Sequence, residues 1–573
     1  MLTGDTIQVL KGSDLELEYS KDILRCLLLT RHPPTLEELA VVAGLPEQDW
    51  ENRNELKKHV VRCGALTTMF EDDQDIKVQL SHPSVREFLK SKTNGWLSMG
   101  PEQIQHGVIA LRCFDYVLSV VKATPEVQSE VGQDEPDEAD QTSNVETDQN
   151  QEDQEEERSD NDKNDEDDED DESESTPDDN QENSEKDVLK YPITQWIEHA
   201  LEATSDIVES FDIANVFWVL GSEQRAQWSK AYARCNSELN NEGSGFDEQF
   251  TAMHVAAYFG YLPLADLLLK SNQHDEEIQT TDSQGMQPLY WACRRGHMNM
   301  VQKLCEVDKT GDAINFQQTE DHATALHGAI ESGDSEIVAY LLNHGAEVNR
   351  PNSEIGSALY FASQKGAIGI VQQLLDRQAD PNLPGGSQVT ALAAAVESED
   401  LNVVKLLVEN GAEINPSVEY SLGNSLGAAC YWGECEIAEY LLEKGCDYTK
   451  KACDDTTPIE TAAEEGFADI VQLLLQYDQY LESHEKALLK ATEKGKEEVV
   501  DCLVKQSPNV SRGQAFYSAA RNGHAGIVKI LTRAGIERKT LEDSLYFAVD
   551  YQYEETVQAL LDMGIDANAE GEE

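Results

Sequence analysis

The sequence predicts a mainly α-helical protein whose C-terminal half is a solenoid of stacked helix pairs. The first observation is a short template that recurs every 28 to 37 residues after residue 249. The second is that apolar residues make up only 39% of the 573 residues, so part of the chain is expected to stay unfolded. The third is a dense acidic stretch over 126–187, which marks that unfolded part.

Each copy of the template predicts two short amphipathic helices. The first helix starts where a Thr hydroxyl can cap it or a Pro fits its first turn, as at Thr324 and Pro288. The second carries apolar residues at helical spacing and ends at a glycine, as in Ile337 to Gly345. Because one unit cannot bury its own apolar face, neighbouring units must stack. The second template positions are Ala252, Pro288, Ala325, Ala358, Ala391, Ser425, Pro458, Ala487, Ala515 and Ser544.

These copies resemble the ankyrin repeat, with its T-P-L-H-x-A-A-x-x-G and I-V-x-x-L-L-x-x-G-A elements. Thr251 to Gly260 carries the first element, and Ile337 to Ala346 matches the second. About ten copies cover 249–569, and the last three are shorter, which predicts trimmed loops between their helix pairs. We expect the template histidines, His254 and His327, to bond turn backbone groups and to have no ligand or catalytic role.

The resemblance implies that the residue after the template histidine, and the two before the glycine, line a concave protein-binding face. Large aromatic residues and arginines at such positions are typical of binding hot spots. The alternative is that some of them only pack against the adjacent hairpin. The predicted protein-binding residues are Tyr258, Phe259, Trp291, Arg294, Arg295, Phe361, Tyr431, Trp432, Phe547 and Tyr551.

Residues 18–95, after an N-terminal extension over 1–17, predict a small folded domain. Three helices are expected, over about 19–30, 35–43 and 54–63, followed by strands at 66–70 and 76–80. This order is that of a winged helix. Winged helices often bind DNA, but residues 1–124 hold 14 Lys and Arg against 18 Asp and Glu, which argues against it.

Three segments of this domain look like the winged helix that follows the NTPase core in fungal NACHT-ankyrin proteins, which are NOD-like signal-transducing NTPases. They are 23–29, 34–40 and 80–89, and stretches near 106–121, 191–196 and 217–232 resemble the helical spacer of the same proteins. The resemblance implies a spacer in two parts, 100–125 and 188–248, around the acidic tract. It also implies that His82 senses nucleotide phosphates if an NTPase core is present; the alternative is that His82 pins the hairpin to the next helix.

The acidic tract dominates the charge of the chain. Residues 130–187 hold 29 acidic residues against Arg158, Lys163 and Lys186, and the net charge of the whole chain is −66. Such a stretch is expected to be a disordered, solvated insert, or alternatively a tail that attracts basic proteins such as histones. The net charge disfavours direct binding to nucleic acid or to anionic membranes.

Several enzyme motifs are absent from the sequence, among them G-x-x-x-x-G-K-[ST], G-x-S-x-G and H-E-x-x-H. The 11 cysteines are scattered without a C-x-x-C pair, which is typical of a reduced chain, and no secretory signal is visible. We therefore expect no enzymatic activity, cofactor or metal, and a cytoplasmic location with the nucleus as an alternative.

The predicted function is a non-enzymatic scaffold or adaptor that binds a protein on its concave face, in NOD-like signalling or self/non-self sensing. One alternative is the sensor and regulatory arm of a NACHT-type NTPase switch, truncated upstream. The other is an acidic nuclear scaffold that binds basic proteins.

Overall fold

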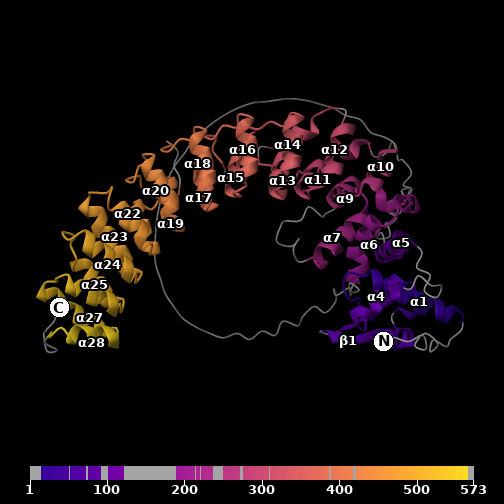
Figure 1. Ribbon diagram of the computed structural model, residues 1–573, viewed down its shortest axis with the longest axis horizontal. Coiled ribbons are helices and arrows are strands. Elements are labelled where there is room, and N and C mark those ends of the chain that lie inside the picture. The colour runs from indigo at the N-terminus through magenta and orange to yellow at the C-terminus, as the bar shows by residue number, and fades with distance from the viewer. Residues whose placement is uncertain are drawn as a thin grey trace, which may run out of the picture.

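The computed structural model describes residues 14–565 apart from 51, 73–74, 92–100, 122–188, 213–214, 220, 237–248, 271–274, 309, 320, 386–388 and 417–420. The described chain is mainly helical and forms an arch, with the N-terminal domain at one foot and the last helix pair at the other (Figure 1). The predictions for 126–187 and for residues 1–13 of the N-terminal extension concern residues outside the described ranges. No helix among the described residues is long and apolar enough to cross a bilayer.

The N-terminal domain contains three helices, a β-hairpin and a fourth helix, in the predicted order. Thr35 caps the second helix through a reciprocal capping box with Glu38, and Gly44 ends it in the left-handed conformation. The hairpin ladder runs from the Thr67–Leu80 pair to the Asp72–Asp75 pair, so the first strand extends two residues beyond the prediction. The elements are α1 (Asp14–Leu29), α2 (Leu36–Ala43), α3 (Arg53–Arg62), β1 (Thr67–Asp72), β2 (Asp75–Leu80) and α4 (Pro83–Ser91).

The spacer consists of α5 (Glu102–Val120), α6 (Lys190–Glu202) and α7 (Glu223–Cys235), with α5 and α6 packed side by side. An aromatic cluster holds it together. The Phe114 ring lies 4.9 Å from the Trp196 ring and 5.4 Å from the Trp218 ring, centroid to centroid, and the Trp228 indole donates to the Ile193 carbonyl. Buried aromatic pairs of this kind stabilise beyond their buried area, so the spacer is a packed unit.

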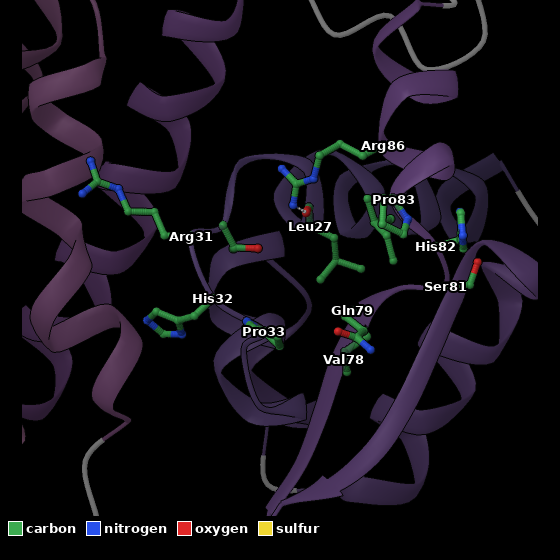
Figure 2. A pocket seen from close by; sticks show the side chains of 12 residues that line it. Leu27, Arg31, His32, Pro33, Val78, Gln79, Ser81, His82, Pro83 and Arg86 are labelled. Carbon is green, nitrogen blue, oxygen red and sulfur yellow. Dashed lines mark hydrogen bonds between the residues drawn. The ribbon is translucent and has the colours of Figure 1, made fainter.

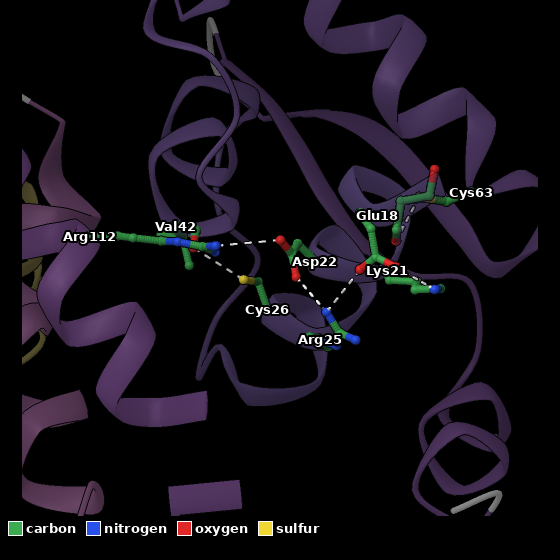
Figure 3. Close-up of polar contacts among 9 residues, drawn as sticks. Glu18, Lys21, Asp22, Arg25, Cys26, Val42, Cys63 and Arg112 are labelled. Carbon is green, nitrogen blue, oxygen red and sulfur yellow. Dashed lines mark hydrogen bonds and ion pairs between the residues drawn. The ribbon is translucent and has the colours of Figure 1, made fainter. Parts of the chain in front are cut away.

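Polar contacts join the spacer to the N-terminal domain (Figure 3). Arg112 of α5 donates to the Val42 carbonyl at 3.2 Å and pairs with Asp22 at 3.4 Å. The buried Glu38 carboxylate accepts the backbone N–H of Tyr191 at 2.7 Å while it caps α2. These bonds tie α2 to α5 and α6, in addition to the apolar core that the two units share.

The array follows as successive helix pairs. The first helix of each pair lies on the inner side of the arch and the second on the outer side, as α13 to α20 show in Figure 1. The inner helices are α9 (Ala252–Phe259), α11 (Pro288–Arg294), α13 (Ala325–Ser332), α15 (Ala358–Gln364), α17 (Ala391–Glu397), α19 (Ser425–Trp432), α21 (Pro458–Glu465), α23 (Leu481–Glu493), α25 (Gly513–Arg521) and α27 (Arg538–Asp550). The outer helices are α10 (Leu262–Lys270), α12 (Met298–Val307), α14 (Ser335–Asn343), α16 (Ile368–Asp376), α18 (Leu401–Glu409), α20 (Cys435–Glu443), α22 (Ala468–Leu474), α24 (Glu497–Gln506), α26 (Ala525–Arg533) and α28 (Glu554–Leu561).

The template histidines form the backbone hydrogen bonds that the sequence predicts. His327 shares a capping box with Thr324, and its Nε2 lies 3.0 Å from the Gly356 carbonyl of the next hairpin. His254 does the same with Thr251 and the Met286 carbonyl, and burial lowers the pKa of both histidines to about 4. The prediction that both histidines bond turn backbone groups is confirmed.

The loops of the last copies are shorter, which also confirms the prediction. Six residues separate α24 from α25, whereas fourteen separate α14 from α15. Short connections still allow the inner helices to stack, since α23, α25 and α27 pack against one another in turn.

Candidate protein-binding surface

The predicted contact residues lie on the inner helices or at their C-terminal ends, but their environments differ. Tyr258, Phe259 and Trp291 are only 4%, 7% and 3% exposed. The prediction that these three line an open surface is wrong. The Phe259 ring packs edge-on against Tyr232 of the spacer at 5.6 Å, so the spacer covers this end of the array.

The contacts of the Trp291 side chain explain why it belongs to the core. Its indole Nε1 donates to Asp282 Oδ2 at 2.7 Å, and its ring lies 5.9 Å from the Phe250 ring and 5.7 Å from the Tyr258 ring. The indole therefore joins the hairpin before α11 to the inner helices of the first two repeats.

The two arginines in the second repeat are engaged within the chain. The Arg295 guanidinium lies 4.5 Å from the Tyr258 ring centroid, and Arg294 pairs with Glu331 of the third repeat at 3.0 Å. Arg294 also lies 5.4 Å from the Trp291 ring centroid. A pocket of about 450 Å³ lies here between spacer and array; its lining includes Glu198, Leu201, Tyr232, Phe259, Arg295 and His297.

Tyr431 and Trp432, in the sixth repeat, are the predicted residues that form an open aromatic pair. They are 41% and 48% exposed, and their rings meet edge to face at 5.1 Å. Gly433 ends α19 with a φ of 85°, a conformation that favours glycine, and a Cβ there would meet the Phe467 ring at 2.5 Å. The turn thus fixes both side chains at the end of the inner helix.

The remaining predicted residues are half-buried or exposed, and each contacts a neighbouring side chain. Phe361 is half-buried, with Lys365 Nζ 5.4 Å from its ring centroid, and Phe547 is half-buried against Tyr517 at 4.8 Å. Tyr551 is 48% exposed and stacks with Tyr553 at 6.2 Å. The structure therefore brings the predicted residues together in separate groups along the inner side of the arch.

Carboxylates occupy the repeats and turns that flank the Tyr431–Trp432 pair, and they are not among the residues predicted from the sequence. Glu397 ends α17, and Glu464 and Glu465 end α21, so they occupy the same template positions in the two flanking repeats. Glu399 and Glu434 belong to the adjoining turns. The pKa of Glu434 is raised by its partial burial first, and then by the charges of Glu399 and Glu436. Comparing the ends of the inner helices and the turns that follow them across copies would have found them.

His82 lies on the wall of a different pocket, in the N-terminal domain (Figure 2). Its Nδ1 is 2.8 Å from Ser84 Oγ and accepts the Ser84 backbone N–H at 3.1 Å, so it caps the start of α4. The pocket measures about 300 Å³, and Arg31, His32 and Arg86 are among its lining residues. Arg86 itself donates to the Leu27 and Leu28 carbonyls at the end of α1.

No group of three metal-ligating side chains occurs within the part of the chain that the structure describes. All 11 cysteines are free there, and burial raises the pKa of Cys26, for instance, to about 12. A thiol of this kind is inert, because the thiolate is the reactive form.

Comparison with known proteins agrees with the architecture. The family model for ankyrin repeats (3 copies) matches residues 253–352, 359–452, 426–514 and 488–570. The chain is 30% identical over 269 residues to mouse protein fem-1 homolog A-like, which is 45% of this chain and 36% of that protein. It is 31% identical over 101 residues to palmitoyltransferase AKR1 of Lachancea kluyveri, which is 18% of this chain and 13% of that protein. The aligned part therefore spans about a third or less of these curated relatives. The repeats, matched over more than half of its length, place the chain in the ankyrin-repeat family.

Proposed function

We propose that the protein is a non-enzymatic scaffold that binds a protein partner on the inner face of its ankyrin array, with Tyr431 and Trp432 as anchors. The observation that carries the proposal is the half-exposed aromatic pair on α19. Tyr and Trp are enriched among hot-spot residues because they bury a large area and lose little side-chain entropy.

The middle of the arch suits this role better than its first repeats. Near the spacer the aromatic residues are covered, and Arg294 and Arg295 are used within the chain. Around α19 the rings protrude from a firm base, since Leu426, Ala429 and Cys430 of the same helix are fully buried. A rigid scaffold that presents exposed aromatic groups needs little reordering on binding.

The biological setting that we propose is NOD-like signalling or self/non-self sensing, in the cytoplasm with the nucleus as an alternative. The N-terminal domain and spacer would serve as a docking base that moves with the array. Support for a firm connection comes from Arg225 of α7, which is buried and donates to the carbonyls of Phe217, Val219 and Phe250.

A second candidate is a sensor arm that works with a separate NACHT-type NTPase. The observation in its favour is the pocket beside His82, whose lining includes His32, His82 and Arg86 in a chain of net charge −66, while Arg31, also in the lining, pairs with Glu198 and Glu202 of α6. In that case the partner would be a nucleotide-binding protein, and its binding would not depend on Tyr431 and Trp432.

The test is quantitative co-purification of the tagged full chain from its own cells. We expect Tyr431→Ala with Trp432→Ala to lose the main partner by roughly 30-fold or more, since a hot spot contributes about 2 kcal/mol or more. The matched control is Tyr480→Ala with Leu481→Ala, which removes an apolar pair that is 62% and 46% exposed in the eighth repeat.

Three results decide between the candidates. Equal loss in both double variants, or in neither, would contradict the proposed site. A nucleotide-binding partner that survives both changes would favour the sensor arm. Loss only on deletion of 126–187 would favour the acidic scaffold that binds basic proteins.

A further inference from the structure

The residues that precede each turn after an inner helix form a stripe along the array, here called the inner stripe. Its members in the first three repeats are Tyr258 and Phe259, Arg294 and Arg295, and Glu331 and Ser332. Its members in the fifth to seventh repeats are Glu397 and Ser398, with Glu399 next in the turn, then Tyr431 and Trp432, then Glu464 and Glu465.

At the start of the array the inner stripe holds a complete set of aromatic ring, arginine and carboxylate. The Arg295 guanidinium stacks on the Tyr258 ring at 4.5 Å, and Arg294 reaches Glu331 at 3.0 Å. The side chain of Arg294 is only 14% exposed, so this ion pair is partly shielded from water. The chain thus shows how this scaffold binds an arginine pair: one guanidinium on a ring, the other on a carboxylate of the next repeat.

In the middle of the array the rings and carboxylates recur without the arginines. No cation–π contact to Tyr431 or Trp432 occurs among the described residues, and neither Glu399 nor Glu465 has an ion pair there. The neighbouring lysines are bound to other groups: Lys490 and Lys494 pair with Glu464, and Lys496 donates to the Glu465 backbone carbonyl, which leaves the Glu465 carboxylate without an ion pair among the described residues.

The local field around Glu434 and Cys435, in the turn after Trp432, is negative. Burial first, and then the charges of Glu399 and Glu436, raise the pKa of Glu434. Burial first, and then Asp469, Glu439 and Glu436, raise the pKa of Cys435, and no cation is among the causes for either group. An exposed aromatic pair with Glu399 and Glu465 unpaired among the described residues of the flanking repeats is complementary to a cationic segment, which it would also attract over a distance.

We propose that the partner presents an arginine-containing basic segment to the inner stripe, with a guanidinium over the Trp432 ring and neighbouring cationic groups on Glu399 and Glu465. This inference rests on the proposed function and names the chemistry of its partner. Arginine fits better than lysine, because its planar group stacks on a ring while its edge donates paired hydrogen bonds to a carboxylate.

The experiment selects random dodecapeptides displayed on phage against the full chain and removes those that still bind Tyr431→Ala with Trp432→Ala. We expect the remaining peptides to be enriched in arginine. Replacing arginine by citrulline, which is neutral and of the same shape, should weaken a labelled peptide by about tenfold or more in fluorescence anisotropy at physiological salt. Lysine in its place should weaken binding less than citrulline but measurably.

Protein variants complete the test. Glu399→Gln with Glu465→Gln should weaken the same peptide by about tenfold, whereas Glu409→Gln with Glu413→Gln, two exposed carboxylates of the fifth repeat outside the stripe, should change it less than twofold. Thermal unfolding of each variant shows that the fold is retained, and Trp432→Phe, which keeps a ring, should recover part of the affinity.

The outcomes separate the two proposals. Peptides whose binding depends on Trp432 but that lack arginine, or that bind equally well with citrulline or lysine in its place, would overturn the proposal of an arginine-containing partner. They would leave the proposed scaffold function standing. If the binding of arginine peptides is lost only when residues 126–187 are deleted, the attraction belongs to the acidic tract, and this result would overturn the proposed arginine contact with the inner stripe as well. A selection without any Trp432-dependent peptide would overturn both proposals.

Discussion

Replacing Trp291 by alanine tests the distinction between core and surface on which the account depends. Trp291 is 3% exposed and contacts aromatic rings of the first repeat. Truncation of a buried Trp costs about 3–5 kcal/mol in unfolding free energy through lost transfer and a residual cavity. The lost bond to Asp282 adds about 1 kcal/mol, since Asp282 keeps the backbone N–H groups of Gln284 and Met286.

The assay compares Trp291→Ala with Trp432→Ala in the full chain. Because repeat arrays need not unfold in one step, urea unfolding is combined with hydrogen exchange of peptides from the first three repeats. We expect Trp291→Ala to speed hydrogen exchange strongly in the first three repeats. The unfolding free energy of Trp432→Ala should lie within about 1 kcal/mol of wild type. An unfolding free energy of Trp291→Ala that also lies within about 1 kcal/mol of wild type would refute the interpretation.

Three further predictions concern the interior. Leu341→Ala, at a fully buried site on α14, should cost about 2–5 kcal/mol in urea unfolding; a cost below about 1 kcal/mol would contradict the stacked core. Arg225→Met should loosen the spacer from the first repeat, seen as faster hydrogen exchange in α7 and α9 with unchanged exchange in α19, because three carbonyls, two of them buried, lose their donor. The buried His327, whose pKa falls to about 4 from 6.5, contributes stability that is present above pH 6.5 and is lost as the pH falls toward 4. The difference in unfolding free energy between wild type and His327→Gln should therefore shrink between pH 7 and pH 4.5, and a constant difference would contradict the assignment.

Most of the fold could be predicted from the sequence because its signals are local. Thr324 and His327 cap one helix within four residues, and Ile337 to Leu342 carry the apolar spacing of the next helix. The helix pairs then have one way to bury these faces, which is to stack. The hairpin boundary was less accurate, since the ladder continues through Asp72 and Asp75, which have low strand propensity.

The candidate site was harder to predict because exposure depends on distant neighbours. Tyr258 and Phe259 occupy the same template positions as Tyr431 and Trp432, yet the first pair is buried and the second is open. The difference comes from the spacer, which packs against Phe259 through Tyr232, and no property of a single repeat encodes that contact. An aromatic residue in a repeat template can therefore be assigned to the core or to the binding face only once its covering elements are known.

Protein binding at Trp432 is tested most directly by site-specific photo-crosslinking in the cells that make the protein. A photoreactive phenylalanine replaces Trp432 in one strain and Tyr480, which is 62% exposed, in another. We expect one discrete protein adduct from position 432, absent from position 480 and removed by Glu399→Gln with Glu465→Gln. Adducts of equal yield at both positions, or none at 432 while 480 yields one, would contradict it.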